Sequence, residues 1–493
     1  MSTTSPLRLR LTRRQALGLA AGGAAGAAGL RLVTLHPWGG GQSLAPTAAA
    51  SAAGSNGAWA SPLRDARPLA AHLLRRAGFG YTQQDLDDAA KLSYTDLVDK
   101  LVSTAPQPPQ DLPAAQRFDY RMVSRWWQAH MATTTAQLPE RMTLFWHGHF
   151  TSDYRKANGL PLVYQQNQLY RRLGTSDLRT LLLGVVYDPL MIRYLDLDKS
   201  SAAAPNENFA REVMELYTLG AGNYGEQDVR EGARALSGIR IALVDSSGAP
   251  VPLPKRNGMT VKEYAQQLAQ LVDTGAHFAG QLQPRVHDGG SKTYLGRTGN
   301  LGPDQVVDTL LAQSACAPFI ATKALVYFAT PSPSKDLVTR VATQFRNSKY
   351  DVKTLLRAIF TSSEFTDPSN YRSLVRSPVD YTVATMRALQ RPDLALQAVN
   401  AGGGMDQVLY DMPTVAGWPV NGGWVSSSSW LARVNFAQTA VSARGAALPD
   451  VRTAVHAQLD GVVGPDTADV LNHAVTDTDR WYALLASPEF HLK

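Results

Sequence analysis

The sequence predicts a mainly α-helical protein, a multi-helical globular domain with a small irregular or β insertion. Apolar residues recur at helical spacing along most of the chain after residue 68. The periodic segments begin at residues that cap helices and end at glycines. The periodicity breaks between residues 239 and 295, where Val, Pro and Gly are mixed. With 44% hydrophobic residues in a chain of 493, there is enough apolar material for a large core.

Start and stop residues define the individual helices. Thr82, with Asp85 three residues later, predicts a capping box. Asn206 can cap a helix over 206–219 that Gly220 closes, and a helix over 226–236 should stop at Gly238. Met122, Trp126 and His130 share one face of a helix over 117–131. Further helices are expected over 70–77, 139–148, 161–172, 177–187, 189–195, 261–273, 303–315, 318–328, 335–346, 352–361, 378–389, 430–442 and 480–486.

The N-terminus has the pattern of an export signal. Arg13 and Arg14 precede a weakly apolar Ala/Gly stretch, and small residues follow near Ala45 and Ala60. Adjacent arginines are typical of the twin-arginine route. A retained membrane anchor is the alternative, but the apolar stretch is short and interrupted by glycines.

These features divide the chain into three parts. Residues 1–45 are the predicted signal, 46–67 an Ala/Gly/Ser-rich linker and 68–493 the helical domain, with 239–295 as its insertion. The mature protein is expected in the periplasm or outside the cell. No later segment has the length and apolarity of a transmembrane helix.

Charge and cysteine content exclude several classes of function. Residues 1–60 carry five arginines and no acid, which leaves 43 basic and 41 acidic residues in the remainder. Nucleic-acid binding is therefore not expected. The single cysteine, Cys316, excludes an intramolecular disulfide and a Cys-rich metal site, and favours a buried structural role. The common hydrolase, zinc-protease, phosphate-loop and covalent-haem motifs are absent from the sequence.

One helical segment carries two carboxylates one turn apart. Arg211, Glu212 and Glu215 lie on one stripe of the helix over 206–219, beside an apolar flank. Such carboxylates can ligate a cation or act as an acid/base pair. The alternative is a solvated face on which Arg211 pairs with Glu215.

Histidines and a glycine-rich loop supply further candidates. His147 and His149 could converge on a metal ion if the chain turns at Gly148, although packing among aromatic residues is at least as common. An Asp-Gly-Gly turn brings His287, Asp288 and Lys292 onto one loop, which could equally be an ordinary turn. The Trp/Gly/Pro-rich segment 417–424 suggests either a wall against which a flat molecule packs or a rigid structural loop.

Six ordered blocks resemble a known bacterial family, domain of unknown function 1800. The blocks are 72–80, 145–150, 206–220, 228–238, 287–296 and 417–419, and a closing Ser-Pro-Glu-Phe at 487–490 also matches. The resemblance covers the chain from about residue 68 to its end. It departs at Gly148, where the family often has Asn, and at 236–239, where it often has Leu-Thr-Gly-Trp. The resemblance implies an exported helical protein and a sulfatase-like partner of the family called domain of unknown function 1501. It implies no established activity.

Two hypotheses of function follow. The first is a metal-dependent envelope enzyme in which His147, His149, Glu212 and Glu215 hold a divalent metal and Arg211, Glu212, Glu215, His287, Asp288 and Lys292 serve catalysis. The second is a non-catalytic binding or assembly protein that works with the sulfatase-like partner. Convergence of the polar blocks would favour the enzyme, and their dispersal would favour the binding protein.

Overall fold

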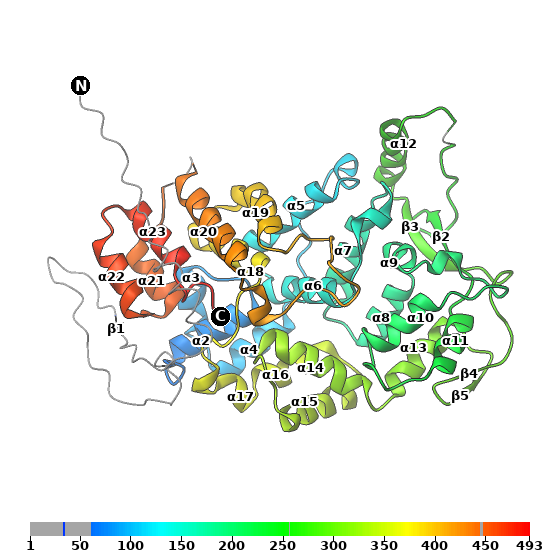
Figure 1. Cartoon of the computed structure of the whole chain (residues 1–493), viewed down its shortest axis with the longest axis horizontal. Coiled ribbons are helices and arrows are strands. Elements are labelled where there is room, and N and C mark those ends of the chain that lie inside the picture. Colours follow the sequence, from blue (N-terminus) through cyan, green and yellow to red (C-terminus); the bar gives the residue numbers. More distant parts are fainter. Residues whose placement is uncertain (1–32, 35–60, 256, 444–446) are drawn as a thin grey trace.

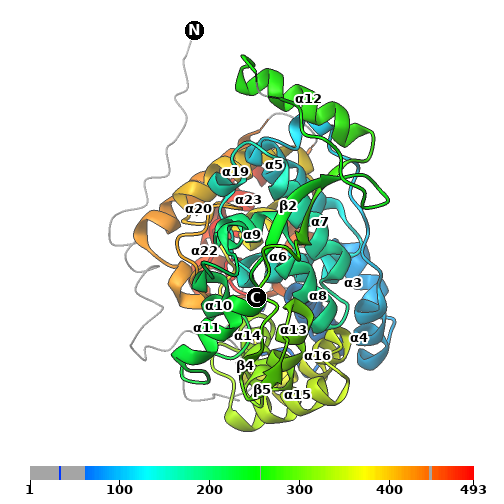
Figure 2. The same ribbon diagram turned by 90° about the vertical axis from the view of Figure 1, so that its right-hand side faces the viewer.

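A computed structural model describes residues 33–34, 61–255, 257–443 and 447–493. The predicted signal and linker therefore lie largely outside the described residues. The described part is elongated (Figure 1), and α21, α22 and α23 occupy the end opposite β2, β3 and α12. Seen from the latter end, α12 projects on one side, with α11, β4 and β5 on the other (Figure 2).

The structure confirms a mainly helical fold with a few two-stranded sheets. The helices of the first half are α2 (Ala66–Ala77), α3 (Gln83–Ala89), α4 (Tyr94–Ser103), α5 (Tyr120–Thr133), α6 (Gln137–His149), α7 (Leu162–Leu173), α8 (Leu178–Val186), α9 (Pro189–Tyr194), α10 (Glu207–Glu215) and α11 (Glu226–Ala235). Those of the second half are α12 (Val261–Asp273), α13 (Pro303–Ala312), α14 (Cys316–Phe328), α15 (Lys335–Asn347), α16 (Val352–Phe360), α17 (Ser363–Thr366), α18 (Pro378–Leu389), α19 (Ala395–Gly404), α20 (Ser427–Ser442), α21 (Val451–Leu459), α22 (Pro465–His473) and α23 (Asp477–Ala486).

The insertion contains most of the β structure. Strands β2 (Ile239–Val244) and β3 (His277–Leu282) form an antiparallel pair with Ile239 opposite Leu282, and α12 connects them. A second hairpin joins β4 (Lys292–Tyr294) to β5 (Arg297–Gly299). The remaining pair joins β1 (Val33–Thr34) to β6 (Val462–Val463). The break in helical periodicity over 239–295 thus corresponds to the β2–β3 strand pair, its connection through α12 and the start of the β4–β5 hairpin.

Helices α3 and α10 begin at the capping residues that the sequence predicts. Thr82 and Asp85 form the expected capping box of α3, and the Asn206 side chain accepts a hydrogen bond from Asn208 N at 2.9 Å. The predicted helix over 206–219 ends earlier, at Glu215. Beyond it, Tyr217 N donates to Glu212 O and Leu219 N to Met214 O, five residues back, so the α-helical pattern is lost.

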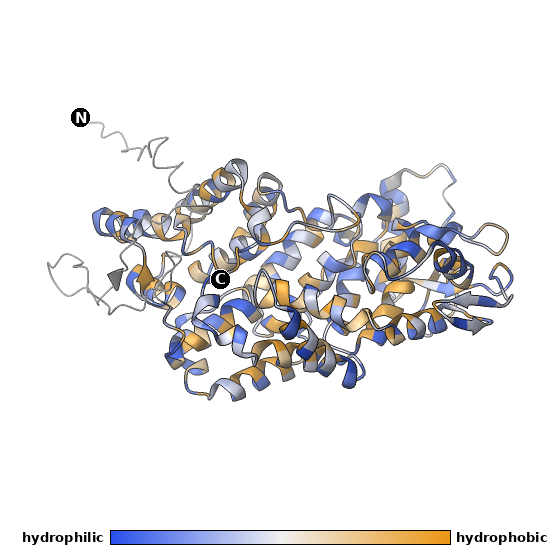
Figure 3. Ribbon diagram, turned by 60° about the horizontal axis from the view of Figure 1, so that its bottom comes forward, coloured by the Kyte–Doolittle hydropathy of each residue, from blue (hydrophilic) through white to orange (hydrophobic). Residues whose placement is uncertain are grey.

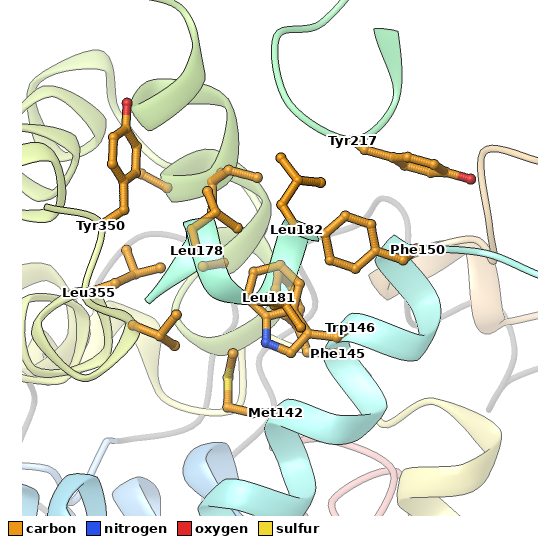
Figure 4. Packing of buried hydrophobic residues seen from close by; sticks show 14 of the residues in the cluster. Met142, Phe145, Trp146, Phe150, Leu178, Leu181, Leu182, Tyr217, Tyr350 and Leu355 are labelled. Atoms are coloured by element: carbon orange, nitrogen blue, oxygen red, sulfur yellow. The ribbon is translucent and has the colours of Figure 1, made fainter. Parts of the chain in front are cut away.

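Two large apolar clusters form the core, and α6 contributes to both. One includes Met142, Phe145 and Trp146 of α6, and the other includes Leu144 with residues of α5, α18 and α20. Figure 4 shows the α6 side chains facing Leu181 and Leu182 of α8. Single helices carry both hydrophobic and hydrophilic residues (Figure 3), as expected for elements that bury one face.

None of the described helices alone is long and apolar enough to cross a membrane. One pair, α13 and α14, meets the criteria of length and composition together but is bent by 78°.

Candidate functional site

Helix α6 places the two predicted histidines on different sides of the core. All of its residues from Leu138 to His147 are buried, and so is His149. Successive helical positions differ by about 100°, so two residues separated by one point in nearly opposite directions. His147 contacts the segment around Tyr410 and Trp418, whereas His149 contacts the chain that follows α10.

His147 is held as a neutral ring. Its Nε2 accepts a hydrogen bond from Tyr410 N at 3.2 Å, and burial lowers its pKa to about 3. The single proton of the neutral ring is therefore on Nδ1. This Nδ1 is buried without a hydrogen-bond partner among the described residues. An unpartnered buried donor costs roughly 1–3 kcal/mol, which makes it a feature that needs an explanation.

His149 is also neutral but has a partner. Its Nε2 donates to Tyr217 O at 2.9 Å. Burial first, and the nearby Lys323 ammonium second, lower its pKa to about 3.

Charged residues of α10 form ion pairs and hydrogen bonds with residues of α10 itself and of the chain that follows it. Arg211 forms an ion pair with Glu226 at 2.8 Å and a longer one with Glu207 at 3.4 Å. Glu215 accepts a hydrogen bond from the Tyr224 hydroxyl. Glu212 is half-buried, and burial followed by the Glu215 charge raises its pKa.

The loop residues 287–292 form a separate group that packs against α11. Asp288 pairs with Arg234 at 2.7 Å, and the Lys292 ammonium donates to the carbonyls of Asp288 and Gly290. His287 Nδ1 donates to Ser237 O at 2.8 Å. Gly238 permits this approach, because a Cβ there would lie 2.8 Å from the His287 backbone and its φ is +84°.

The predicted metal ligands are not assembled. In the part of the chain that the structure describes, no three His, Cys, Asp or Glu side chains are placed to hold a metal ion. The proposed set of His147, His149, Glu212 and Glu215 is therefore wrong as a cluster. The histidines bind backbone groups on different sides of α6, and Glu215 binds Tyr224. The catalytic roles of Arg211, Glu212, Glu215, His287, Asp288 and Lys292 remain predictions.

A cavity of about 240 Å³ lies between α6, α14 and the segment 414–424, called here the Trp418 strap. It can hold one small organic molecule. Its aromatic walls come from Phe145, Tyr327, Trp418 and Trp424. His149 also lines it, but Glu212 and Glu215 do not. The other lining residues are Leu144, Gly148, Leu216, Thr322, Lys323, Val326, Leu374, Val375, Ser377, Asp380, Gln407, Ala416, Pro419, Val420, Asn421 and Lys493.

One carboxylate, Asp380, binds two cations at the cavity lining. Arg141 forms a bidentate ion pair with it, and Lys493 Nζ lies 2.6 Å from Asp380 Oδ2. All three side chains are at most 5% exposed. Burial, followed by the charges of Arg141, Arg76 and Arg376, lowers the pKa of Lys493 well below its ordinary value.

Two further buried arginines lie near Lys493 and, in the part of the chain that the structure describes, pair with backbone carbonyls and not with carboxylates. The Arg76 guanidinium donates to the carbonyls of Ala329 and Asn370, and Arg376 donates to those of Phe79 and Leu492. Because an arginine retains its charge at neutral pH, these two guanidinium groups, which do not line the cavity themselves, add positive charge behind its Asp380 side.

Lys323 of α14 adds a further cation to the cavity lining. Its ammonium lies 5.4 Å from the centre of the Phe319 ring, and its side chain is exposed at the cavity. Packing around it lowers its pKa through desolvation, with no carboxylate contributing. The cavity therefore joins aromatic walls to two lysines and one carboxylate that is already paired.

The Trp418 strap closes one side of the cavity. Thr151 Oγ1 donates to Val415 O at 2.6 Å, and Val375 N donates to Asn421 Oδ1 at 2.7 Å. At Gly417, φ is +93° and a Cβ would lie 2.7 Å from Gly148 O, so only glycine fits. The Trp418 ring then packs over Gly148. Trp418 and Trp424 therefore line the cavity, and the role of this segment as a wall for a flat molecule remains a prediction.

Sequence reasoning missed Lys323, Tyr327, Asp380 and Lys493. Asp380 is part of the capping box of α18, and this local role explains it fully at the level of sequence. Lys323 looks in the sequence like an ordinary lysine of a helix. Trp418 was the one available signal, because a Trp among glycines and prolines is unusual.

The comparisons with known proteins identify the family. A family model described as protein of unknown function (DUF1800) matches residues 72–492. No curated protein and no solved structure is detectably similar to the chain. Because the model covers most of the chain, from α2 to the last strand-like contact at Leu492, the protein belongs to the DUF1800 family, whose function is unknown.

Proposed function

We propose that the protein binds a small organic anion with a flat apolar body, and that it does so outside the cytoplasm. The observation that carries this proposal is the lining of the α6–α14 cavity. Aromatic rings favour a flat apolar partner, and the excess of buried and nearby cations favours a negative group.

The charge arrangement favours an anion over a neutral ligand. Asp380 carries one negative charge and contacts two basic side chains, and Arg76 and Arg376 donate to neutral carbonyls. A carboxylate, sulfonate or phosphate in the cavity would add counter-charge and accept charge-assisted hydrogen bonds. The metal-dependent enzyme lacks comparable support, because its ligand set is not assembled. The binding protein is therefore the preferred of the two hypotheses.

A pair of ligands that differ only in charge tests this proposal by calorimetric titration. We expect 2-naphthoate to bind at least about tenfold more tightly than the neutral 2-naphthylmethanol, since charge-assisted hydrogen bonds are roughly twice as strong as neutral ones. Replacing Lys323 with Gln should weaken naphthoate binding about five- to tenfold and affect the alcohol little.

Lys335→Gln is the matched control, because Lys335 is an exposed lysine that does not line the cavity. It should leave both affinities unchanged. Equal affinity of the protein for the acid and the alcohol, or binding of neither, would contradict the proposal.

The site of action requires export, and the twin arginines provide the test. Replacing Arg13 and Arg14 with Lys should leave the precursor in the cytoplasm, because that route reads the arginine pair. Fractionation of cells that produce the native and altered precursors measures this. Normal export of the altered precursor would show that another route is used.

A further inference from the structure

Trp418 separates the cavity from a second group of polar side chains. One side of its ring lines the cavity and packs over Gly148. It also meets the His147 ring edge-on, with 5.4 Å between ring centres. Its indole Nε1 is buried without a hydrogen-bond partner among the described residues. Packing alone therefore holds this side chain in place.

Behind Trp418 lies a continuous series of buried polar residues. The rings of His147 and Tyr410 are 4.6 Å apart, and Tyr410 in turn lies beside the Asn167 amide. His147 and Asn167 are 1% exposed, and Tyr410 is fully buried. These residues come from α6, α7 and the segment that follows α19, so three distant parts of the chain meet here.

The polar atoms of this group have unused hydrogen-bonding capacity. Among the described residues, His147 Nδ1–H has no acceptor, and neither the two amide atoms of Asn167 nor the Tyr410 hydroxyl, which can donate or accept, makes a hydrogen bond of normal geometry. The indole N–H of Trp418 adds another donor. Counted together, donors exceed acceptors, and such a group is complementary to a ligand atom that accepts hydrogen bonds.

The strap that carries Trp418 is rich in glycine and partly exposed. Gly417 precedes Trp418 with a positive φ, and Gly422 and Gly423 follow it at the rim. Pro419 and Val420 between them are exposed, and the two anchoring hydrogen bonds of the strap are made at Val415 and Asn421, on either side of this short stretch.

We infer that Trp418 is a movable plug, and that its displacement joins the cavity to the His147–Asn167 group, which then binds the anionic end of the ligand. This inference rests on the proposed function and deepens it. It assigns the acceptor group of the ligand to the donors behind the plug, and the flat body to the aromatic cavity. The ligand class that follows is an aromatic acid whose acid group lies close to the ring, as in 2-naphthoate.

Asn167→Leu tests where the acid group binds. The substitution removes an amide without well-formed hydrogen bonds, so the protein should fold with an unchanged or higher melting temperature. If the inference is correct, calorimetric titration should show 2-naphthoate affinity falling about tenfold. Unchanged affinity in a folded Asn167→Leu protein would overturn the inference.

Trp418→Ala tests the plug itself by stopped-flow measurement of naphthoate association. We expect association to be at least about fivefold faster than in the native protein, because the ring no longer has to move first. Trp424→Ala is the matched control, since it removes another aromatic wall without opening the route to His147. An equal acceleration in both variants, or in neither, would contradict the plug.

Different results would disprove the plug alone and both proposals together. If Lys323→Gln weakens naphthoate binding while Asn167→Leu and Trp418→Ala bind as the native protein does, the cavity is the whole site and the plug is wrong. If the native protein binds no naphthoate, both proposals are wrong.

Discussion

Replacing Asp380 with Asn should lower the free energy of unfolding by about 3–5 kcal/mol. Breaking a buried ion pair by removing one partner leaves an uncompensated buried charge, and two cations share this carboxylate. Burial, together with the charges of Arg141, Arg76 and Arg376, already lowers the pKa of Lys493, so the amine should lose its proton in the variant. Urea unfolding followed by circular dichroism measures the change.

Asp336→Asn provides the control for this substitution. Asp336 pairs with Arg340 on the surface of α15, and its side chain is 75% exposed. Exposed pairs of this kind contribute at most about 1 kcal/mol, so the unfolding curve should hardly move. If the two variants lose similar amounts of stability, the Asp380 network does not hold the cavity lining together.

The protein should also lose stability as the pH falls from 7 to 5.5. Burial is the main cause that lowers the pKa of four histidines, to about 3 for His147 and His149 and well below the usual value for His72 and His491. Above the unfolded pKa of about 6.5, these four rings are neutral in both the folded and the unfolded state, so their burial is not opposed by protonation. Below this pH, protons bind the rings of the unfolded chain but not the buried rings, and this stabilises the unfolded state. Together, the four histidines lower the free energy of unfolding by about 5 kcal/mol between pH 7 and pH 5.5.

Asp188 acts in the opposite direction. Burial raises its pKa to about 7, so its protonated form favours the folded state and its contribution grows as the pH falls toward 5.5. The protonation of Asp188 adds back about 1.5 kcal/mol, which leaves a net loss of about 3.5 kcal/mol. Urea unfolding at the two pH values measures the loss. Replacing the exposed His473 with Gln should not change it, whereas equal or greater stability at pH 5.5 would show that the four histidines are not buried as neutral groups.

Local features of the fold were predictable because neighbouring residues determine them. The bounds of α12, Val261–Asp273, agree with the sequence-based range, and Asn206 caps α10 as expected. The end of α10 was not predictable in this way. The chain there follows tertiary contacts, including the hydrogen bond from His149 to Tyr217 O, and so leaves the helix before Gly220.

The cavity was predictable only in part because its residues meet through tertiary packing. Arg141 and Asp380 are 239 positions apart, and Lys493 lies 113 positions beyond Asp380. Nothing in their local sequence distinguishes them from surface charges. The two histidines of α6 attracted attention as metal ligands, yet a helix buried on all sides explains them as ring packing and backbone hydrogen bonding.

A crystal structure of the protein with bound 2-naphthoate tests the central claim most directly. The account predicts the naphthalene ring in the α6–α14 cavity against Phe145 and Trp418, or in the place that Trp418 vacates. The carboxylate should lie within hydrogen-bond distance of Lys323, Lys493 or the donors of His147 and Asn167. Naphthoate bound only elsewhere on the protein, with the cavity unoccupied at saturating ligand, would contradict the account.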